Sequence, residues 1–459
     1  MVEVPPIQPL RVKLTGPIVV GKDILELLSS AMYVNPLAIY REYVQNAADS
    51  LDEAAELGLY RNGSRPVIRI TVDPVERRTI IHDNGAGVPR GAFTRTLTAI
   101  GGSRKRGTTA RGFRGVGRLA GLGYCQELVM RSRSPGDNHV STLYWDCKRL
   151  KELLRDPADL TLEQILSEIV EVGTLPAAGL PPHFFEIEMR NVIRYKNDIL
   201  LNHSALEDFM AQVGPVPFNP EFSFGKEIQA YMAKHNAAKT YAITLNGKSV
   251  FRPHLDNYEA RPKVHGKFTN VEFFEIQGMS VETDAVGWIL HGDYLGAIPN
   301  RHGVKGIRIR VGNIQIGDSR LLDQAFPEAR FNAWTVGECH VLSSNLIPNA
   351  RRDDFEQNTH YSNLLGHLVP KAKQIAKACR DRSAERTRQR REAAERNNAN
   401  GHTVDWVKAK VFLSKNARKP LSATHKSEIK KMLRTGPPTY ADLVRVLIGA
   451  PNVPKNNPK

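Results

Sequence analysis

The chain has 459 residues, of which 41% are hydrophobic and 24% are charged, and its formal net charge is +16. A chain of this length can hold two or three domains, and its hydrophobic content is typical of folded globular proteins. No run of about twenty apolar residues is present, which excludes an ordinary transmembrane helix, and we expect no secretory signal because the first residues lack a basic and then apolar segment.

The net charge indicates the kind of partner that the protein binds, and the cysteine spacing indicates its redox compartment. The excess of lysine and arginine favours a polyanionic partner, DNA or RNA first, although a basic soluble surface explains it equally well. The four cysteines form no C-x-x-C pair, and the histidines show no H-x-x-x-H spacing. We therefore expect free thiols in a reducing compartment, a cytoplasmic location and no metal site built from protein side chains alone.

The first part of the chain predicts a helix followed by antiparallel strands. Apolar residues at three- and four-residue spacing indicate a helix over 23–57, interrupted near Asn35 and ended by Gly58. Alternating residues then predict a hairpin that turns at Asp73. These strands are not separated by regular helices, which favours an α/β fold with a mixed, largely antiparallel sheet over a parallel, doubly wound one. The predicted strands are 65–73, 77–89, 126–134, 139–147 and 183–192.

A proline-interrupted helical connector leads to a second set of strands. We assign residues 1–198 to a first domain, 199–236 to the connector, 237–360 to a second α/β domain, and 361–459 to a basic helical C-terminal region with a disordered end. The second domain is expected to contain strands at 240–251, 271–278, 286–296, 306–318 and 338–344. Arginine and alanine predict a long helix over 371–398.

One face of the first predicted helix is polar. Glu42, Asn46 and Asp49 stand at i, i+4 and i+7 and therefore share one side of an α-helix. Ordinary core packing does not explain such a face. Either it is solvated or it borders a polar site, and each of these residues taken alone fits a surface or structural role.

Two glycine motifs follow this helix. D-N-G-A-G-V begins at Asp83, at the end of a predicted strand, and G-F-R-G-V-G ends at Gly117, where a helix is expected to begin near Val116. Glycines at such places let the backbone approach a ligand, and free N–H groups at a helix start favour phosphate. D-N-G alone is also ordinary turn chemistry. The overlapping G-V-G-R-L-A matches a dinucleotide fingerprint only weakly, because no buried strand precedes it.

The three motifs occur in the order E-x-x-x-N-x-x-D, D-x-G-x-G and G-x-x-G-x-G. Together they resemble the GHKL ATPases, which include gyrase B, heat-shock protein 90 chaperones, histidine kinases and MutL, with the MORC proteins as relatives. The stretches Y-R-E-Y-V-Q-N-A-A-D-S-L and G-F-R-G-V-G-R-L-A-G-L-G are most similar to the heat-shock protein 90 branch. The resemblance implies a Bergerat-type α/β sandwich, followed by an α/β middle domain of the ribosomal S5-like transducer type.

This resemblance implies that the chain binds ATP with Mg²⁺ and assigns roles to the motif residues. Glu42 is expected to be the general base that activates water, Asn46 to offer its side-chain oxygen to Mg²⁺, and Asp83 to accept a hydrogen bond from the adenine amino group. Thr174, in E-V-G-T, is the candidate for a threonine that the family places near the adenine-binding aspartate. The positions expected to line the base and the phosphates are Gly85, Gly87, Gly112, Gly115, Val116 and Gly117.

A later segment, N-L-I-P-N-A-R-R-D-D-F, resembles the middle domain of heat-shock protein 90. In that family an asparagine and an arginine from this segment complete the ATP site, and here they fall on Asn349 and Arg352. Arg352 is expected to stabilise the charge that develops on the γ-phosphate. Arg351 is an alternative, because a slip of one residue exchanges the two. Lys305 is a weaker candidate, since gyrase-like and MutL-like relatives use a lysine from their second domain.

Two functions fit these predictions. The first is an ATP-driven conformational clamp on nucleic acid, in which ATP pairs two subunits as a homodimer and the basic stretch at 379–396 contacts phosphates. A solvated helix or a coiled-coil arm is the alternative for that stretch. The second is a chaperone-like or scaffold ATPase that acts on a protein partner, with an operon-encoded partner in a bacterial defence setting as one version of this alternative. The segment at the lid position, residues 101–111, is shorter and more basic than a chaperone lid, so lid-controlled closure of the chaperone kind is not expected.

Overall fold

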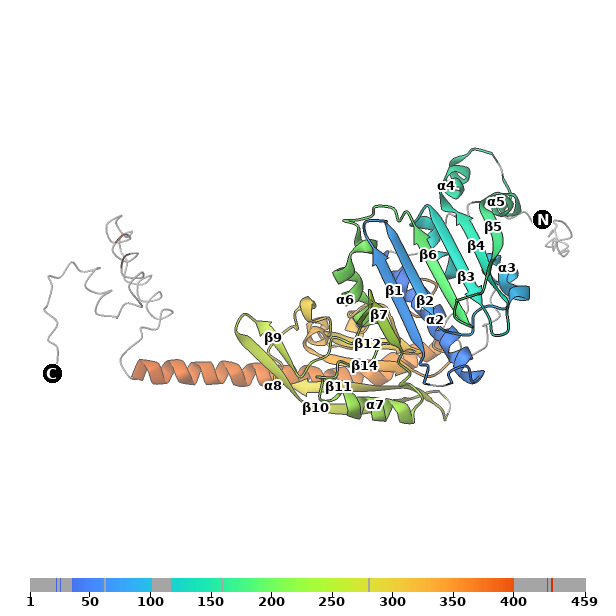
Figure 1. The fold of residues 1–459 in the computed structure, drawn as a ribbon. Helices are drawn as coiled ribbons and strands as arrows, with labels where there is room; N and C mark the ends of the chain where they lie inside the picture. The colour runs from blue at the N-terminus through green and yellow to red at the C-terminus, as the bar shows by residue number, and fades with distance from the viewer. Residues whose placement is uncertain are drawn as a thin grey trace, which may run out of the picture. The chain divides into compact units, whose positions relative to one another are not determined.

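The computed structural model describes residues 35–61, 63–100, 117–158, 160–279 and 281–399, together with residues 22, 25, 427 and 431. The chain divides into two compact units, residues 1–376 and residues 377–459. The first unit contains two β-sheets with helices packed against them (Figure 1). None of the helices in the described part of the chain combines the length and the apolar character needed to cross a membrane.

The first sheet has the strand order β5-β4-β3-β6-β2-β1-β7-β8. All neighbouring strands are antiparallel except β1 and β7, which are parallel. The mixed, largely antiparallel α/β fold that the sequence predicts is therefore confirmed. The strands are β1 (Val67–Asp73), β2 (Arg78–Asp83), β3 (Glu127–Arg133), β4 (His139–Asp146), β5 (Val170–Pro176), β6 (Phe184–Arg190), β7 (Ala242–Leu245) and β8 (Lys248–Ser249).

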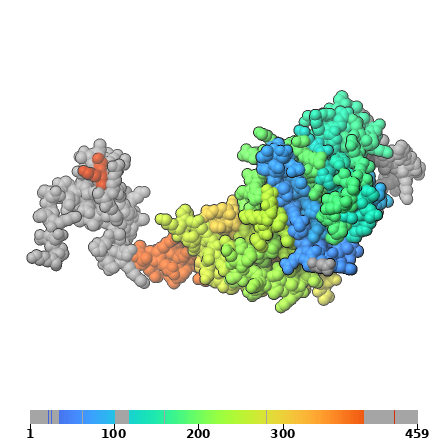
Figure 2. Space-filling model, in the orientation of Figure 1, coloured from blue at the N-terminus to red at the C-terminus, as the bar shows by residue number. Residues whose placement is uncertain are grey.

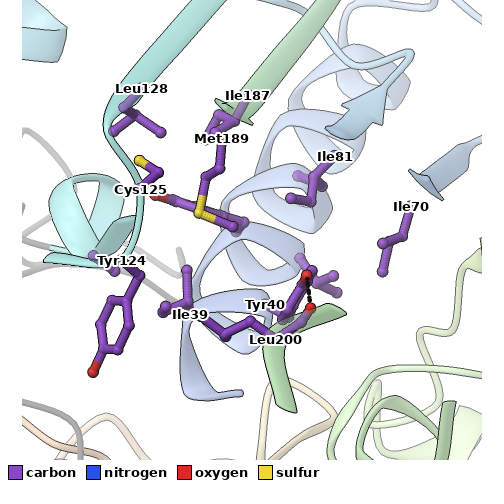
Figure 3. Close-up of a cluster of buried hydrophobic side chains, with 14 of the residues drawn as sticks. Ile39, Tyr40, Ile70, Ile81, Tyr124, Cys125, Leu128, Ile187, Met189 and Leu200 are labelled. Carbon is purple, nitrogen blue, oxygen red and sulfur yellow. Dashed lines mark hydrogen bonds between the residues drawn. The ribbon is translucent and has the colours of Figure 1, made fainter. Parts of the chain in front are cut away.

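The helix α2 (Ala38–Glu56) packs on one face of this sheet. Alternation in β1 explains why that face is apolar, because Ile68, Ile70 and Val72 are buried while the residues between them are exposed. Figure 3 shows apolar side chains of α2 meeting those of β1, β2 and β6. The buried hydroxyl of Tyr40 within this core donates to the carbonyl oxygen of Leu200 at 2.7 Å, as a buried polar group requires.

The opposite face of the first sheet is charged, and Figure 2 shows its strands at the surface of the molecule. Arg131 on β3 bonds to Glu186 and Glu188 on β6, each at 2.7 Å. Arg190 on β6 bonds to Glu127 on β3 at 2.8 Å. Cross-strand pairs of opposite charge are ordinary stabilising contacts on an open sheet face, so these charges need no ligand to explain them.

The second sheet has the order β13-β12-β14-β11-β10-β9, with only β12 and β14 parallel. Its strands are β9 (Asn257–Arg261), β10 (Val264–Gln277), β11 (Thr283–Gly292), β12 (Gly306–Val311), β13 (Ile314–Ile316) and β14 (Val336–Val341). Two connector helices, α6 (His203–Val213) and α7 (Gly225–Lys234), lie between β6 and β7 along the chain, and α7 packs on β11 of the second sheet. The other α-helices of the described residues are α3 (Arg90–Thr98), α4 (Cys147–Arg155), α5 (Leu162–Ile169) and α8 (Thr359–Ala399).

One expectation about an element was wrong, and three elements were not predicted. The strand expected to open the second domain, β7, instead pairs with β1 in the first sheet, and the side-chain amide of Asn246 bonds to the backbone of Val72 in both directions. Alternating residues identify a strand but not its partner, so the sequence could not predict that β7 pairs with β1 of the first sheet. In addition, β5 and the short helices α4 and α5 were not anticipated, although Thr161 and Gln164 form a capping box at the start of α5.

Candidate functional site

The polar face of α2 is enclosed rather than solvated. Glu42 and Asp49 are only 7% and 8% exposed, and Asn46 between them is partly exposed. The helix continues to Glu56, and Gly58 ends it with a φ of +65°, a left-handed conformation that glycine adopts without steric cost. Of the two alternatives that the sequence left open, the structure therefore favours a polar site.

The carboxylate of Glu42 lies between two arginines and a glycine. Its Oε1 atom is 3.1 Å from a terminal nitrogen of Arg41 and 3.7 Å from Nε of Arg352. A Cβ atom added to Gly117 would come within 2.7 Å of Oε2. The carboxylate therefore has one cationic partner on its own helix and another from a distant part of the chain, and it leaves no room for a side chain at position 117.

Arg352 reaches α2 from a tight loop that follows the second sheet. Pro348 and Phe355 close this loop as an isolated antiparallel bridge. Arg41 donates to the carbonyl oxygens of Arg351 and Arg352, at 3.0 and 3.4 Å. Arg352 has a φ of +55°, which costs a residue with a side chain on the order of 1 kcal/mol. The contacts with Arg41 thus hold a locally strained loop against the helix that carries Glu42.

The two adjacent arginines of this loop have different surroundings. The side chain of Arg352 is 9% exposed beside Glu42, whereas that of Arg351 is 55% exposed and pairs with Asp353 at 3.3 Å. The amide nitrogen of Asn349 donates to Asp353 at 2.6 Å, and its oxygen accepts from the backbone N–H of Asp353. Arg352 is therefore the arginine next to Glu42, and Asn349 shapes the loop from which Arg352 extends.

Asp83 and the turn that follows it pack against α2. Asp83 is 2% exposed, and its Oδ1 atom accepts a hydrogen bond from the backbone N–H of Gly85 at 2.9 Å. The backbone N–H of Ala86 donates to the carbonyl oxygen of Ser50 on α2 at 3.1 Å. A Cβ atom on Gly85 would lie 2.1 Å from the Ser50 hydroxyl. The first glycine motif is thus held close against the helix that carries Glu42.

Gly87 allows a prediction about stability. It has a φ of +68°, and an added Cβ atom would lie 2.2 Å from the carbonyl oxygen of Arg133. We expect Gly87→Ala to lower the free energy of unfolding by about 2 kcal/mol or more. Gly91, in the first turn of α3, has nothing within 4 Å, so Gly91→Ala should be neutral or stabilising by up to about 1 kcal/mol. Urea denaturation of both variants tests this contrast, and equal effects would contradict it.

The second glycine motif is described only from Gly117 onward. Gly117 begins a 3-10 helix, η1 (Gly117–Gly123), and the backbone N–H of Gly121 donates to the hydroxyl of Tyr43 on α2 at 2.8 Å. The helix expected near Val116 is therefore present, but it is of the tighter 3-10 type. The predicted phosphate-loop residues Gly112, Gly115 and Val116 lie outside the described residues.

Thr174 does not lie near Asp83, and this expectation is corrected. It lies on β5, opposite Ser141 of β4, and three strands separate β5 from β2, which ends at Asp83. Neighbouring strands are about 4.8 Å apart, which places Thr174 roughly 19 Å from the strand of Asp83. The expectation failed because E-V-G-T supplied a threonine on a later strand but no information about strand pairing, and β5 pairs at the far edge of the sheet.

Residues at the start of β6 occupy the position beside Asp83 instead. Phe185 lies directly opposite Asp83 in the register, and Nδ1 of His183 is 2.8 Å from the carbonyl oxygen of Gly85. Tyr60 also lies at this turn, where its hydroxyl donates to the carbonyl oxygen of Asn84 at 3.2 Å. Burial and, to a smaller extent, the carboxylates of Asp83 and Asp52 raise the pKa of Tyr60. The sequence offered no signal for these neighbours, since they depend on which strand pairs with β2.

Two further cationic residues, Arg41 and Lys305, bear on the site. Arg41 was not singled out, although it is buried and connects Glu42 to the loop of Arg352. Its position immediately before Glu42 was the available signal. Lys305, the weaker candidate, lies between the short helix η3 (Asn300–His302) and β12.

Comparison with known proteins bears directly on this arrangement. A family profile described as histidine kinase-, DNA gyrase B- and HSP90-like ATPase matches residues 38–170, which include α2, Asp83 and η1. The chain carries an ATPase domain of the GHKL class. The superfamily resemblance inferred from the three motifs is thereby confirmed.

Individual relatives of this GHKL domain are chaperones, at low identity. The chain is 25% identical over 142 residues to the chaperone protein HtpG of Salmonella paratyphi A, covering 27% of this chain and 23% of the relative. It is 28% identical over 140 residues to HtpG of Polaromonas naphthalenivorans (27% and 22%) and 24% identical over 165 residues to HtpG of Escherichia coli O1:K1 (32% and 26%). The chain thus spans only about a quarter of the length of these relatives.

Proposed function

We propose that this chain hydrolyses Mg-ATP and couples hydrolysis to contact between the first sheet domain and the loop at 348–355. The observation that carries this proposal is the approach of Arg352 to Glu42, with Nε and Oε1 3.7 Å apart. A GHKL domain supplies the carboxylate, and a segment beyond the second sheet supplies the cation. Charge developing during phosphoryl transfer would be stabilised by that cation, so turnover would depend on both segments.

The proposed roles follow from the positions of the residues. Glu42 activates the attacking water and Asp83 accepts a hydrogen bond from the nucleobase, while Gly85, Gly87 and Gly117 let the backbone of the two glycine motifs pack closely around these residues. Before ATP binds, Glu42 is paired with Arg352. A γ-phosphate would compete for that guanidinium, because arginine binds phosphate strongly. Glu42 would then keep Arg41 as its cationic partner, at 3.1 Å, and would act on water from that position.

Magnesium fits the residues available on α2. The amide of Asn46 is partly exposed, lies one turn from Glu42 on the same face, and offers the neutral oxygen that Mg²⁺ accepts beside phosphate oxygens. When bound, the ion would neutralise phosphate charge. Asn46 would hold and orient it from the protein side.

The target of the ATPase is proposed from charge. The net charge of +16 and the basic carboxyl-terminal half of α8 support a clamp on nucleic acid that forms an ATP-dependent homodimer. The similarity to HtpG, named as a chaperone, supports the second candidate, an ATPase that acts on a protein partner. Stimulation of turnover by duplex DNA would select the first, and a stoichiometric co-purifying protein that stimulates turnover would select the second.

Comparison of Arg352→Ala with Arg351→Ala tests the catalytic proposal. Both variants remove one arginine from the same loop, but only Arg352 lies beside Glu42. We expect Arg352→Ala to reduce Mg-ATP turnover by about a hundredfold and Arg351→Ala to change it by less than about threefold. Thermal unfolding is measured to check that both variants remain folded. Equal turnover in the two variants, or no turnover by the wild type with any partner, would overturn the proposal.

A further inference from the structure

The second half of α8 separates its charges onto different faces. Asp381, Glu385, Arg388, Glu392 and Glu395 follow one another at alternating four- and three-residue steps and therefore share one face. We call this face the acidic stripe. Its single arginine is neutralised within it, because Arg388 pairs with Glu385 at 2.7 Å and with Glu392 at 3.7 Å.

The charged residues of a second face are all arginines. Arg382, Arg386 and Arg390 follow at four-residue steps, about 6 Å apart along the helix axis. At 3.6 residues per turn this arginine stripe is rotated well away from the acidic stripe. Arg382 and Arg390 are exposed, as is every residue from Thr387 to Glu395. Arg382 and Arg390 of the arginine stripe thus present positive charge at the surface of the helix.

The chemistry of the stripe specifies its ligand. Guanidinium groups bind phosphate oxygens through paired hydrogen bonds, and the two exposed groups of Arg382 and Arg390, about 12 Å apart along the axis, match a repeating anion better than a single one. Residues 371–395 contain no tryptophan, tyrosine or phenylalanine. Proteins that hold single-stranded nucleic acid normally stack its bases on aromatic side chains, and this helix offers none. A regular backbone whose bases are already stacked, a duplex, is the polyanion that fits.

We propose that the arginine stripe of α8 binds the phosphate backbone of double-stranded nucleic acid, with the acidic stripe directed away from it. This proposal deepens the proposed clamp function, on which the biological role of duplex binding rests. The binding surface itself consists only of residues of α8. Contacts of this kind are independent of base sequence and weaken as salt concentration rises.

Arg390→Gln and Arg388→Gln form a matched pair for the test. Both remove one exposed arginine, two residues apart on one helix, but only Arg390 belongs to the arginine stripe. Binding of the full-length protein to a fluorescent duplex of mixed sequence is measured across a salt series. We expect Arg390→Gln to lower the salt slope by about 0.9, and Arg382→Gln combined with Arg390→Gln by about twice as much. Arg388→Gln should change affinity by less than about twofold.

Each other outcome counts against the inference. Equal losses in the two single variants would show that net charge, and not the arginine stripe, sets affinity. Tighter binding to a single strand of the same length would overturn the duplex assignment, and a change of oligomeric state in Arg390→Gln alone would assign the stripe to self-association. Mg-ATP turnover of the wild type is measured in parallel. If the protein hydrolyses ATP but does not bind the duplex, only this inference is overturned. If the arginine stripe binds the duplex but the protein does not hydrolyse ATP, only the proposed ATPase function is overturned.

Discussion

Glu42→Gln is expected to reduce Mg-ATP turnover by about a hundredfold or more while ATP binding persists. Glutamine keeps the shape of glutamate but cannot accept a proton. The expected loss follows from the position of the carboxylate, which is 7% exposed and faces Arg352 and Gly117. Steady-state turnover and equilibrium binding of ATP, measured on the same preparation, separate a catalytic loss from a loss of affinity.

A control for this variant is available on the same helix. Glu53 is exposed on α2, so Glu53→Gln removes the same charge without touching the site and should leave turnover within about twofold of the wild type. Because Glu42 is the carboxylate partner of two buried arginines, thermal unfolding must show that Glu42→Gln remains folded. If a folded Glu42→Gln variant hydrolysed ATP as fast as the wild type, Glu42 would not be the general base.

The second large effect is expected at a buried network that joins the connector to the second sheet. Glu338 on β14 is fully buried, bonds to Arg252, and accepts from Nε of Arg310 at 2.6 Å. Arg310 in turn donates to the carbonyl oxygen of Gln212, near the end of α6, at 2.6 Å. Arg252 donates to the carbonyl oxygen of Val216 at 3.1 Å. One carboxylate thus compensates two guanidinium groups that hold the end of the first connector helix.

Glu338→Gln is expected to lower the free energy of unfolding by about 3–5 kcal/mol, because it leaves two buried cations without their carboxylate. Urea denaturation measures the loss. Glu282, exposed at the loop before β11, supplies the control, since Glu282→Gln removes the same charge and should change stability by less than about 0.5 kcal/mol. A loss below about 1 kcal/mol in Glu338→Gln would mean that the network contributes little beyond its desolvation cost.

The same network predicts a pH dependence. Burial alone would raise the pKa of Glu338, but Arg252 and Arg310 outweigh it and hold the pKa well below its usual range. A carboxyl whose pKa is lowered in the folded state stabilises the protein above its unfolded pKa, near 4.3, and loses that contribution as pH falls through the folded value. The difference in stability between the wild type and Glu338→Gln should therefore be greatest near neutral pH and narrow in acid.

Much of the local structure could be predicted because it depends on neighbours in the chain. Periodic apolar residues indicated α2 and α8, and alternation indicated β1, β2 and β3, because burial of one face repeats with the period of the element. Short or atypical elements escaped prediction. The strand β5 is exposed along almost its whole length, so it lacks the alternation by which a half-buried strand is recognised.

In the candidate site, too, residues in local motifs could be predicted, whereas residues placed by strand pairing could not. Glu42, Asn46, Asp83 and the glycines could be named because each motif is local and the order of the motifs is informative. Thr174 was misplaced, and Phe185 and His183 were missed, because these positions depend on the pairing of β6 with β2 and of β5 with β4. Hydrogen bonds between strands leave no local mark that identifies the partner.

The sequence by itself therefore determined the class of the ATPase domain, the helix that carries Glu42 and Asn46, and the turn that follows Asp83. Only the tertiary structure decided that β7 completes the first sheet, that Arg41 holds the loop at 348–355, and that Arg352 rather than Arg351 lies beside Glu42. The physical reason is the range of the interactions. Helix periodicity and glycine conformation act within a few residues, whereas strand pairing and the burial of one of two adjacent arginines depend on surfaces supplied by distant parts of the chain.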